Sequence, residues 1–331
     1  MKLKFLGFAL LAVCVCAVCC MCGSDSKTPD YEFPDGPDPD PDPQPGDYPA
    51  GLTVTEFTDD LGGGKQCLGF VAVADLKANP KLRFNAVHLP QQKIPSRIHA
   101  EFASANRGTA CVTINAGYWW AGNSLSLLVT GGAVKSIENQ TVTRNNQTVY
   151  PVRSSFGQMS SGKFETHWIY CVLDDGNKPY AFPSALDNDE RTNTYMSAPP
   201  TSKTPGAVLW TPQEAVGGGP MLVKEGKNVA VENYWKEVFD GGGIAGTSRQ
   251  PRTAVGATAD GKLILLVCDG RNMRGSAGFT LAELADKLIE LGAVDVDEAL
   301  RIHDHLDAVG IEHLIIRFEN VSELELVGHA G

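Results

Sequence analysis

Residues 251–271 read PRTAVGATADGKLILLVCDGR, two apolar runs separated by the turn sequence ADGK. Short apolar runs bounded by Gly and Asp are typical of strands, and an Asp-Gly pair between them is a hairpin signal. The pattern predicts an antiparallel hairpin in which the start of one strand meets the end of the other. The residues expected together at this open end are Arg252, Thr253, Asp269, Gly270 and Arg271.

Comparable apolar runs, broken by Gly, Asn and Asp, recur along the chain and predict further strands. They lie at 68–76, 110–118, 125–130, 167–173, 207–210 and 218–226. One helix is expected over Thr280–Leu291, because Thr280 and Glu283 form a capping box and Gly292 follows as a stop. Strands outnumber helices, so we expect a single α+β domain with a few helices packed on a mainly antiparallel or mixed sheet.

The N-terminal 51 residues differ in composition from the rest. Lys2 and Lys4 precede an apolar run to Met21, which is typical of an export signal over residues 1–22. The cysteines within it resemble a bacterial lipoprotein signal, with Cys20 and Cys22 as candidates for lipidation. Residues 23–51 are rich in Pro and Asp, which predicts a disordered tether. The expected location is the bacterial envelope, periplasm-facing or at the cell surface, with the lipid in the membrane.

The net charge of the chain argues against one class of partner. The 331 residues carry a net charge of -11 and no basic run, which argues against nucleic acid as a partner.

The domain has four cysteines, of which Cys111 and Cys268 lie in strand-like runs and are expected to be buried thiols. His303 and His305 would point to different faces of a helix, so we predict no metal, and the sequence calls for no cofactor.

Three segments together carry a family resemblance. They are the hairpin above, VGGGPMLVKEGK at 216–227 and NAGYW at 115–119. This combination resembles the phosphodiester glycosidase family, which includes the lysosomal uncovering enzyme, over residues 65–296. The resemblance implies hydrolysis of an α-linked, N-acetylglucosamine-like sugar from a glycosyl phosphodiester.

The resemblance also implies roles for individual residues. Asp269 would be one catalytic carboxylate, while Arg252 or Arg271 would neutralise the phosphate. Free N–H groups of a glycine turn can bind an anion or a sugar hydroxyl. The substrate-binding residues implied are Asn115, Tyr118, Gly217, Gly218, Gly219, Thr253 and Gly270. From spacing alone, a structural Arg–Asp ion pair at the strand end is the alternative.

The last 35 residues depart from the family. Its strand would end in Asp-Gly-Gly-Gly-Ser, which residues 297–331 lack, consistent with a frame change or truncation of the gene. We expect the domain at 52–296 and an atypical tail at 297–331, with a short helix at Glu298–Val309 and strands at 313–318 and 322–327. The alternative function is a non-catalytic carbohydrate-binding surface lipoprotein. Candidates for a second catalytic carboxylate are Asp295, Asp297, Glu298 and Asp304.

Overall fold

One of two seven-stranded sheets is antiparallel and contains the predicted hairpin. A computed structural model describes residues 48–93, 95–104, 108–120, 123–138, 140–240, 246–301 and 310–319. The seven strands in spatial order are β1 (Leu52–Asp60), β2 (Gln66–Ala74), β19 (Leu263–Cys268), β18 (Arg252–Thr258), β20 (Ala293–Arg301), β16 (Met221–Lys224) and β17 (Lys227–Asn228). Arg252 lies opposite Cys268, so the hairpin and its open end are confirmed.

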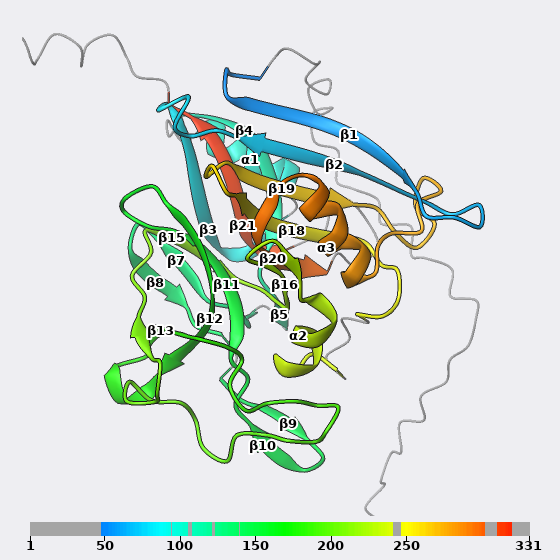
Figure 1. Ribbon diagram of the computed structural model, residues 1–331. Coiled ribbons are helices and arrows are strands. Elements are labelled where there is room, and N and C mark those ends of the chain that lie inside the picture. Colours follow the sequence, from blue (N-terminus) through cyan, green and yellow to red (C-terminus); the bar gives the residue numbers. More distant parts are fainter. Residues whose placement is uncertain are drawn as a thin grey trace, which may run out of the picture. The chain divides into compact units, whose positions relative to one another are not determined.

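A second antiparallel sheet of seven strands is built from the middle of the chain (Figure 1). Its strands in spatial order are β14 (Val208–Leu209), β13 (Lys178–Phe182), β12 (Phe164–Val172), β11 (Arg153–Gln158), β15 (Glu214–Gly217), β7 (Leu128–Thr130) and β8 (Ala133–Ser136). Each strand predicted from the apolar runs overlaps an observed one.

A third sheet joins distant parts of the chain, since β21 (Gly310–Phe318) lies between β3 (Leu82–Lys93) and β4 (Thr109–Ala116). Two small hairpins pair β5 (Trp119–Trp120) with β6 (Asn123–Ser124), and β9 (Val142–Arg144) with β10 (Gln147–Val149). The helices are α1 (Pro95–Ser104), α2 (Ala230–Lys236) and α3 (Leu281–Glu290), and η1 (Leu173–Asp175) is a 3₁₀ turn.

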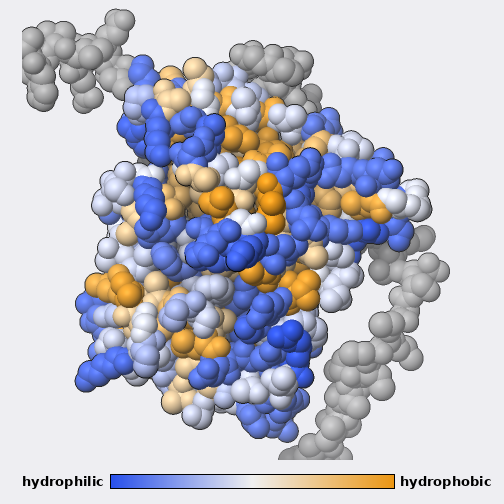
Figure 2. Space-filling model, viewed as in Figure 1, coloured by the Kyte–Doolittle hydropathy of each residue, from blue (hydrophilic) through white to orange (hydrophobic). Residues whose placement is uncertain are grey.

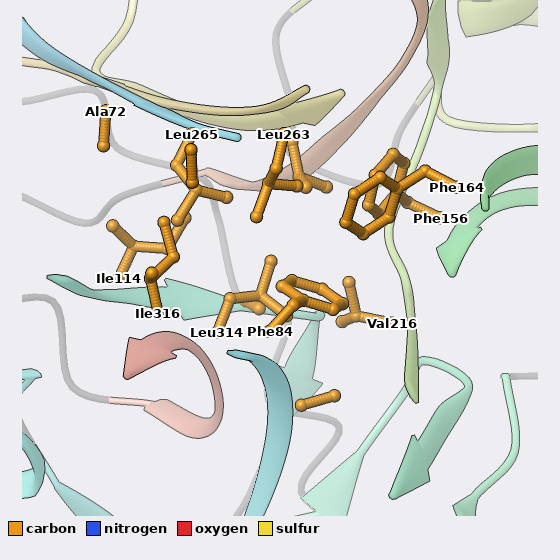
Figure 3. Close-up of a cluster of buried hydrophobic side chains, with 14 of the residues drawn as sticks. Ala72, Phe84, Ile114, Phe156, Phe164, Val216, Leu263, Leu265, Leu314 and Ile316 are labelled. Carbon is orange, nitrogen blue, oxygen red and sulfur yellow. The ribbon is translucent and has the colours of Figure 1, made fainter. Parts of the chain in front are cut away.

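One apolar core forms where side chains from the three main sheets meet, as Figure 3 shows. Phe84 of β3 makes edge contacts with Phe156 and Phe164, at ring-centroid distances of 6.0 and 5.7 Å. A second core lies between the first sheet and α3 (Figure 1). The face seen in Figure 2 is mainly hydrophilic, with small, separated hydrophobic patches. The fold is therefore α+β with antiparallel sheets.

The helix α3 begins as predicted, because Thr280 and Glu283 form both bonds of a capping box. The helix expected from Glu298 is wrong over residues 298–301, which continue β20. Val294 and Val296 alternate with acidic residues, and this period of two fits the strand that pairs with β18. Residues 302–309 and the strand expected at 322–327 lie outside the described residues, as does the N-terminal signal and most of the tether. The strand at 313–318 is confirmed as part of β21.

All four cysteines of the domain are free thiols. Cys268 is fully buried, as expected, whereas Cys111 is only half-buried at the surface side of β4.

Candidate functional site

The open end of the β18–β19 hairpin holds a buried carboxylate. The Asp269 side chain is 1% exposed, and its Oδ2 accepts a hydrogen bond from Arg274 Nε at 2.7 Å and forms an ion pair with Arg274 Nη2, also at 2.7 Å. Its other oxygen, Oδ1, is buried with no hydrogen-bond partner among the described residues. Gly270 is required here, because a Cβ at this position would lie 2.3 Å from Pro251 N. Asp269 thus keeps one oxygen for a further partner while Arg274 balances its charge.

The two arginines predicted at this end differ in environment. Arg252 is fully buried, and it donates from Nε to Phe279 O and from Nη2 to Ser248 O, both at 3.2 Å. Arg271 is exposed in a left-handed turn, with φ of 51°, and its Nε donates to Gln250 Oε1 at 3.0 Å. Arg252 therefore binds the hairpin to the segments before and after it, at Ser248 and Phe279. Arg271 is the predicted cation that reaches the surface.

Asn115 reaches the same hairpin from the end of β4. Thr253 Oγ1 donates to Asn115 Oδ1 at 3.0 Å, and both residues are buried. The amide nitrogen of Asn115 has no hydrogen-bond partner among the described residues. Thr253 lies opposite Val267, two residues before Asp269, so Thr253 and Asp269 share a face of the sheet. The structure thus brings three predicted site residues together.

The glycines at 217–219 lie at the end of β15 and just beyond it, and the N–H groups of the first two are already used. Gly217 N donates to Leu127 O at 2.6 Å and Gly218 N to Ser154 O at 3.3 Å. The expectation of free N–H groups is therefore wrong at these two positions, because β-sheet neighbours occupy them. Gly219 has φ of 99°, and its carbonyl accepts the Tyr118 hydroxyl at 2.6 Å. Tyr118 is half-buried and also packs on Phe239.

A pair of buried carboxylates lies beside these glycines, since a Cβ at Gly219 would be 2.6 Å from Glu237 Oε2. Glu237, which ends α2, accepts bonds at Oε1 from Met221 N and Trp168 Nε1, at 2.9 and 3.0 Å. Its Oε2 accepts from Ser154 N at 2.9 Å. Ser154 Oγ lies 3.1 Å from Glu237 Oε2 and 2.6 Å from Asp297 Oδ1. One hydroxyl therefore bridges two acids that are both fully buried.

Burial favours the uncharged form of Glu237. It raises the pKa of Glu237 to about 7, and hydrogen bonds from Met221, Ser154 and Trp168 oppose part of that rise. The single proton on Ser154 Oγ can be donated to only one carboxylate at a time. Its shorter contact is with Asp297. The carboxyl group of Glu237 can therefore hold a proton near neutral pH.

The four candidates for a second carboxylate occupy different places. Asp295 is half-exposed and pairs with Lys224 at 3.3 Å, which is a surface role. Asp297 is the member of the buried pair. The Glu298 side chain and Asp304 lie outside the described part of the chain. Glu237, Ser154 and Arg274 were not found from sequence, because no local pattern marks them. Among the described residues, no cluster of three or more His, Cys, Asp or Glu is placed to hold a metal ion.

The sequence of residues 128–299 matches the family described as phosphodiester glycosidase. This span is just over half of the chain. The chain belongs to the phosphodiester glycosidase family. The matched segment includes the glycines at 217–219, the hairpin and both members of the Glu237–Asp297 pair, whereas Asn115 and Tyr118 precede it.

Solved structures with a similar arrangement were also found. A hypothetical protein from Synechocystis matches with a TM-score of 0.47 and 18% identity over 81% of this chain and 62% of its own. The second is the catalytic domain of zebrafish N-acetylglucosamine-1-phosphodiester alpha-N-acetylglucosaminidase, auto-inhibited by its pro-peptide. It matches with a TM-score of 0.48 and 15% identity, over 81% of this chain and 82% of its own. A protein from Burkholderia pseudomallei that is described as exported matches with a TM-score of 0.43 and 12% identity, over 76% of this chain and 74% of its own.

The chain thus spans less than two thirds of the Synechocystis protein. No curated protein matches the chain in sequence.

Proposed function

We propose that this protein is an exported, lipid-tethered hydrolase that releases an α-linked, N-acetylglucosamine-like sugar from a glycosyl phosphodiester. The observation that carries the proposal is the family match over residues 128–299, which contains Asp269 and the Glu237–Asp297 pair. Glycosidases use two carboxylates, one to protonate or stabilise and one to attack or activate water. Asp269 and the Glu237–Asp297 pair supply candidate acids for both parts, and all three are buried.

A phosphate leaving group is a weak base, so its departure needs neutralisation of charge more than a strong acid. Arg271 is exposed and Arg274 is 40% exposed beside Asp269, so both can meet an anion that approaches the hairpin end. Arginine suits this task because its planar guanidinium binds phosphate oxygens two at a time and stays charged. Arg252 is proposed to hold these turns in place from beneath.

Asp269 is the proposed reacting carboxylate. Its buried Oδ1 has no hydrogen-bond partner among the described residues, so it would accept a hydrogen bond from a water that enters the site. Thr253 fixes Asn115 Oδ1, which turns the amide nitrogen of Asn115 toward a sugar hydroxyl. Tyr118 offers an aromatic face for the ring. Gly270, and the glycines at 217–219, keep the backbone close to the substrate.

Export and anchoring are proposed from the sequence alone. The apolar run with Cys20 and Cys22 would place a lipid in the bacterial envelope, and residues 23–51 would hold the domain away from the membrane. Among the described residues, no helix is long and apolar enough to cross a bilayer. Metabolic labelling with a palmitate analogue, compared between wild type, Cys20→Ala and Cys22→Ala, tests the anchor. Absence of label from wild type would refute it.

The activity is tested with a synthetic N-acetylglucosamine phosphodiester and detection of the free sugar. Wild type is expected to release sugar, and Asp269→Asn to lose at least about a hundredfold in rate, since the carboxylate would act in the bond-breaking step. Asp295→Asn is the matched control, because this acid is half-exposed and pairs with Lys224. Equal loss in both variants would remove the proposed role of Asp269.

A carbohydrate-binding lipoprotein without turnover is the second candidate. It is favoured by one observation, the absence of Asp-Gly-Gly-Gly-Ser from residues 297–331. Calorimetry with N-acetylglucosamine 1-phosphate separates the two. Binding by wild type, combined with no release of sugar from the diester, would establish the second candidate and reject the first.

A further inference from the structure

The strand β21 brings part of the chain beyond the family match into the core. It lies between β3 and β4, and Leu314, Ile315 and Ile316 are fully buried. Glu312 lies on the same strand, opposite Ala116, and is 1% exposed. A charged residue is rarely buried in this way unless it is paired or neutral.

Two serines hold the Glu312 carboxyl group. Oε1 accepts a hydrogen bond from Ser136 Oγ at 2.8 Å and another from Ser124 Oγ. The other oxygen, Oε2, is buried with no hydrogen-bond partner among the described residues. It lies against Gly117, where an added Cβ would be only 1.7 Å from it. The glycine of the NAGYW segment therefore leaves the space that the acid occupies.

Hydrogen bonds connect this acid to Tyr118. Ser124 Oγ and Ser136 Oγ lie 3.0 and 2.8 Å from the carbonyl of Ser126, which can accept a proton from each. The hydroxyl of Ser126 in turn accepts from Tyr118 N at 2.7 Å. If both serines donate to Ser126 O, the acid must supply a proton of its own to one of them. The uncharged acid therefore supplies a third hydrogen for these four contacts, whereas the ionised acid leaves only the two serine hydrogens.

We propose that Glu312 is a positioning residue for the sugar site, which in its uncharged form fixes the Ser124–Ser126 turn and so holds Tyr118 for a glycosyl phosphate. This rests on the proposed function, because it requires a sugar phosphate to bind beside Tyr118. When Glu312 loses its proton, the two serines turn their hydrogens to the carboxylate and release the carbonyl of Ser126. The turn that supports Tyr118 then loosens.

Among the residues that the structure describes, no cation is paired with Glu312 to compensate its ionisation. Across the neighbouring strands, β4 presents Ala116, while His88 on β3 and Lys135 on β8 are exposed. Burial raises the pKa of Glu312 to about 8, and the hydrogen bonds from the serines oppose part of that rise. Glu312 therefore changes charge between pH 7 and pH 9, after most surface carboxylates have already ionised.

The test compares binding of N-acetylglucosamine 1-phosphate at pH 7 and pH 9 by calorimetry. If only the uncharged form binds, wild-type affinity falls about tenfold over this interval, because about nine tenths of the molecules are ionised at pH 9. Glu312→Gln, which mimics the uncharged acid, is expected to change less than twofold. Glu138→Gln is the matched control, since Glu138 is another buried glutamate with a raised pKa but contacts Cys171 instead. It should keep the tenfold fall.

A ligand-free measurement separates this proposal from the proposed function. Hydrogen exchange of peptides covering Tyr118 to Ser126, corrected for the intrinsic effect of pH, should show protection lost between pH 7 and pH 9 in wild type and Glu138→Gln. Glu312→Gln should retain that protection. If the probe binds no variant, the proposed function fails while the exchange result still decides the role of Glu312. Identical pH responses in wild type and Glu312→Gln, in exchange or in binding, would overturn it.

Discussion

Replacing Ser154 by alanine removes the hydroxyl that bridges two buried acids. Ser154 Oγ lies 2.6 Å from Asp297 Oδ1 and 3.1 Å from Glu237 Oε2, and all three residues are inaccessible to solvent. Water therefore cannot replace the lost donor without rearrangement. A hydrogen bond to a charged group contributes about 1.5–3 kcal/mol, and loss of one oxygen adds only a small cavity. We expect Ser154→Ala to lower the free energy of unfolding by about 2–3 kcal/mol.

Chemical denaturation at pH 7 measures this change, with the denaturant dependence checked for constancy. Ser155→Ala is the matched control, because Ser155 is the next residue of β11 and is 2% exposed. The described residues offer no side-chain hydrogen bond to Ser155, so we expect a loss below about 1 kcal/mol. If the two variants agree within about 0.5 kcal/mol, the bridge contributes nothing and the reasoning is wrong.

Three further substitutions test the same region. Gly219→Ala should destabilise the fold by more than about 2 kcal/mol in thermal unfolding, because φ is 99° and the new Cβ would lie 2.6 Å from Glu237 Oε2; unchanged stability would contradict this geometry. Tyr118→Phe removes the 2.6 Å bond to Gly219 O and should cost about 1 kcal/mol in chemical denaturation, so a neutral result would show that the bond is not maintained. Arg274→Ala leaves Asp269 buried without its cation and should cost about 1–2 kcal/mol, a value reduced because Arg274 is 40% exposed. That loss should appear by chemical denaturation at neutral pH and vanish in the Arg274→Ala, Asp269→Asn double variant.

Local sequence patterns were sufficient to predict the elements whose contacts lie between residues close together in the chain. The ADGK turn and its flanking apolar runs specify the hairpin at Arg252–Cys268, and the capping box specifies the start of α3. The strand β21 pairs with segments about 200 residues earlier in the chain. A local sequence pattern can indicate a strand but cannot predict which distant strands it will pair with. The same reason explains the helix wrongly expected from Glu298, where pairing with β18 decides the structure.

The candidate site also contains residues that the sequence predicted and residues that it did not. Asn115 and Thr253 were predicted as site residues, and they are in contact. Glu237 and Asp297 are 83 and 143 residues from the serine that joins them, so sequence spacing gave no sign of the pair. Asp297 was one of four candidate acids, while Glu237 follows a short helix and carries no motif. Arg274, which pairs with Asp269, lies in a turn whose geometry depends on three left-handed residues.

The central claim is that this member of the phosphodiester glycosidase family cleaves the bond between the sugar and the phosphate oxygen. Hydrolysis of an N-acetylglucosamine phosphodiester in ¹⁸O-labelled water, followed by mass spectrometry of both products, tests it most directly. Attack at the anomeric carbon predicts that the label appears in the released sugar and that the phosphate product stays unlabelled. Label in the phosphate would mean that the phosphorus–oxygen bond breaks, and would contradict the account.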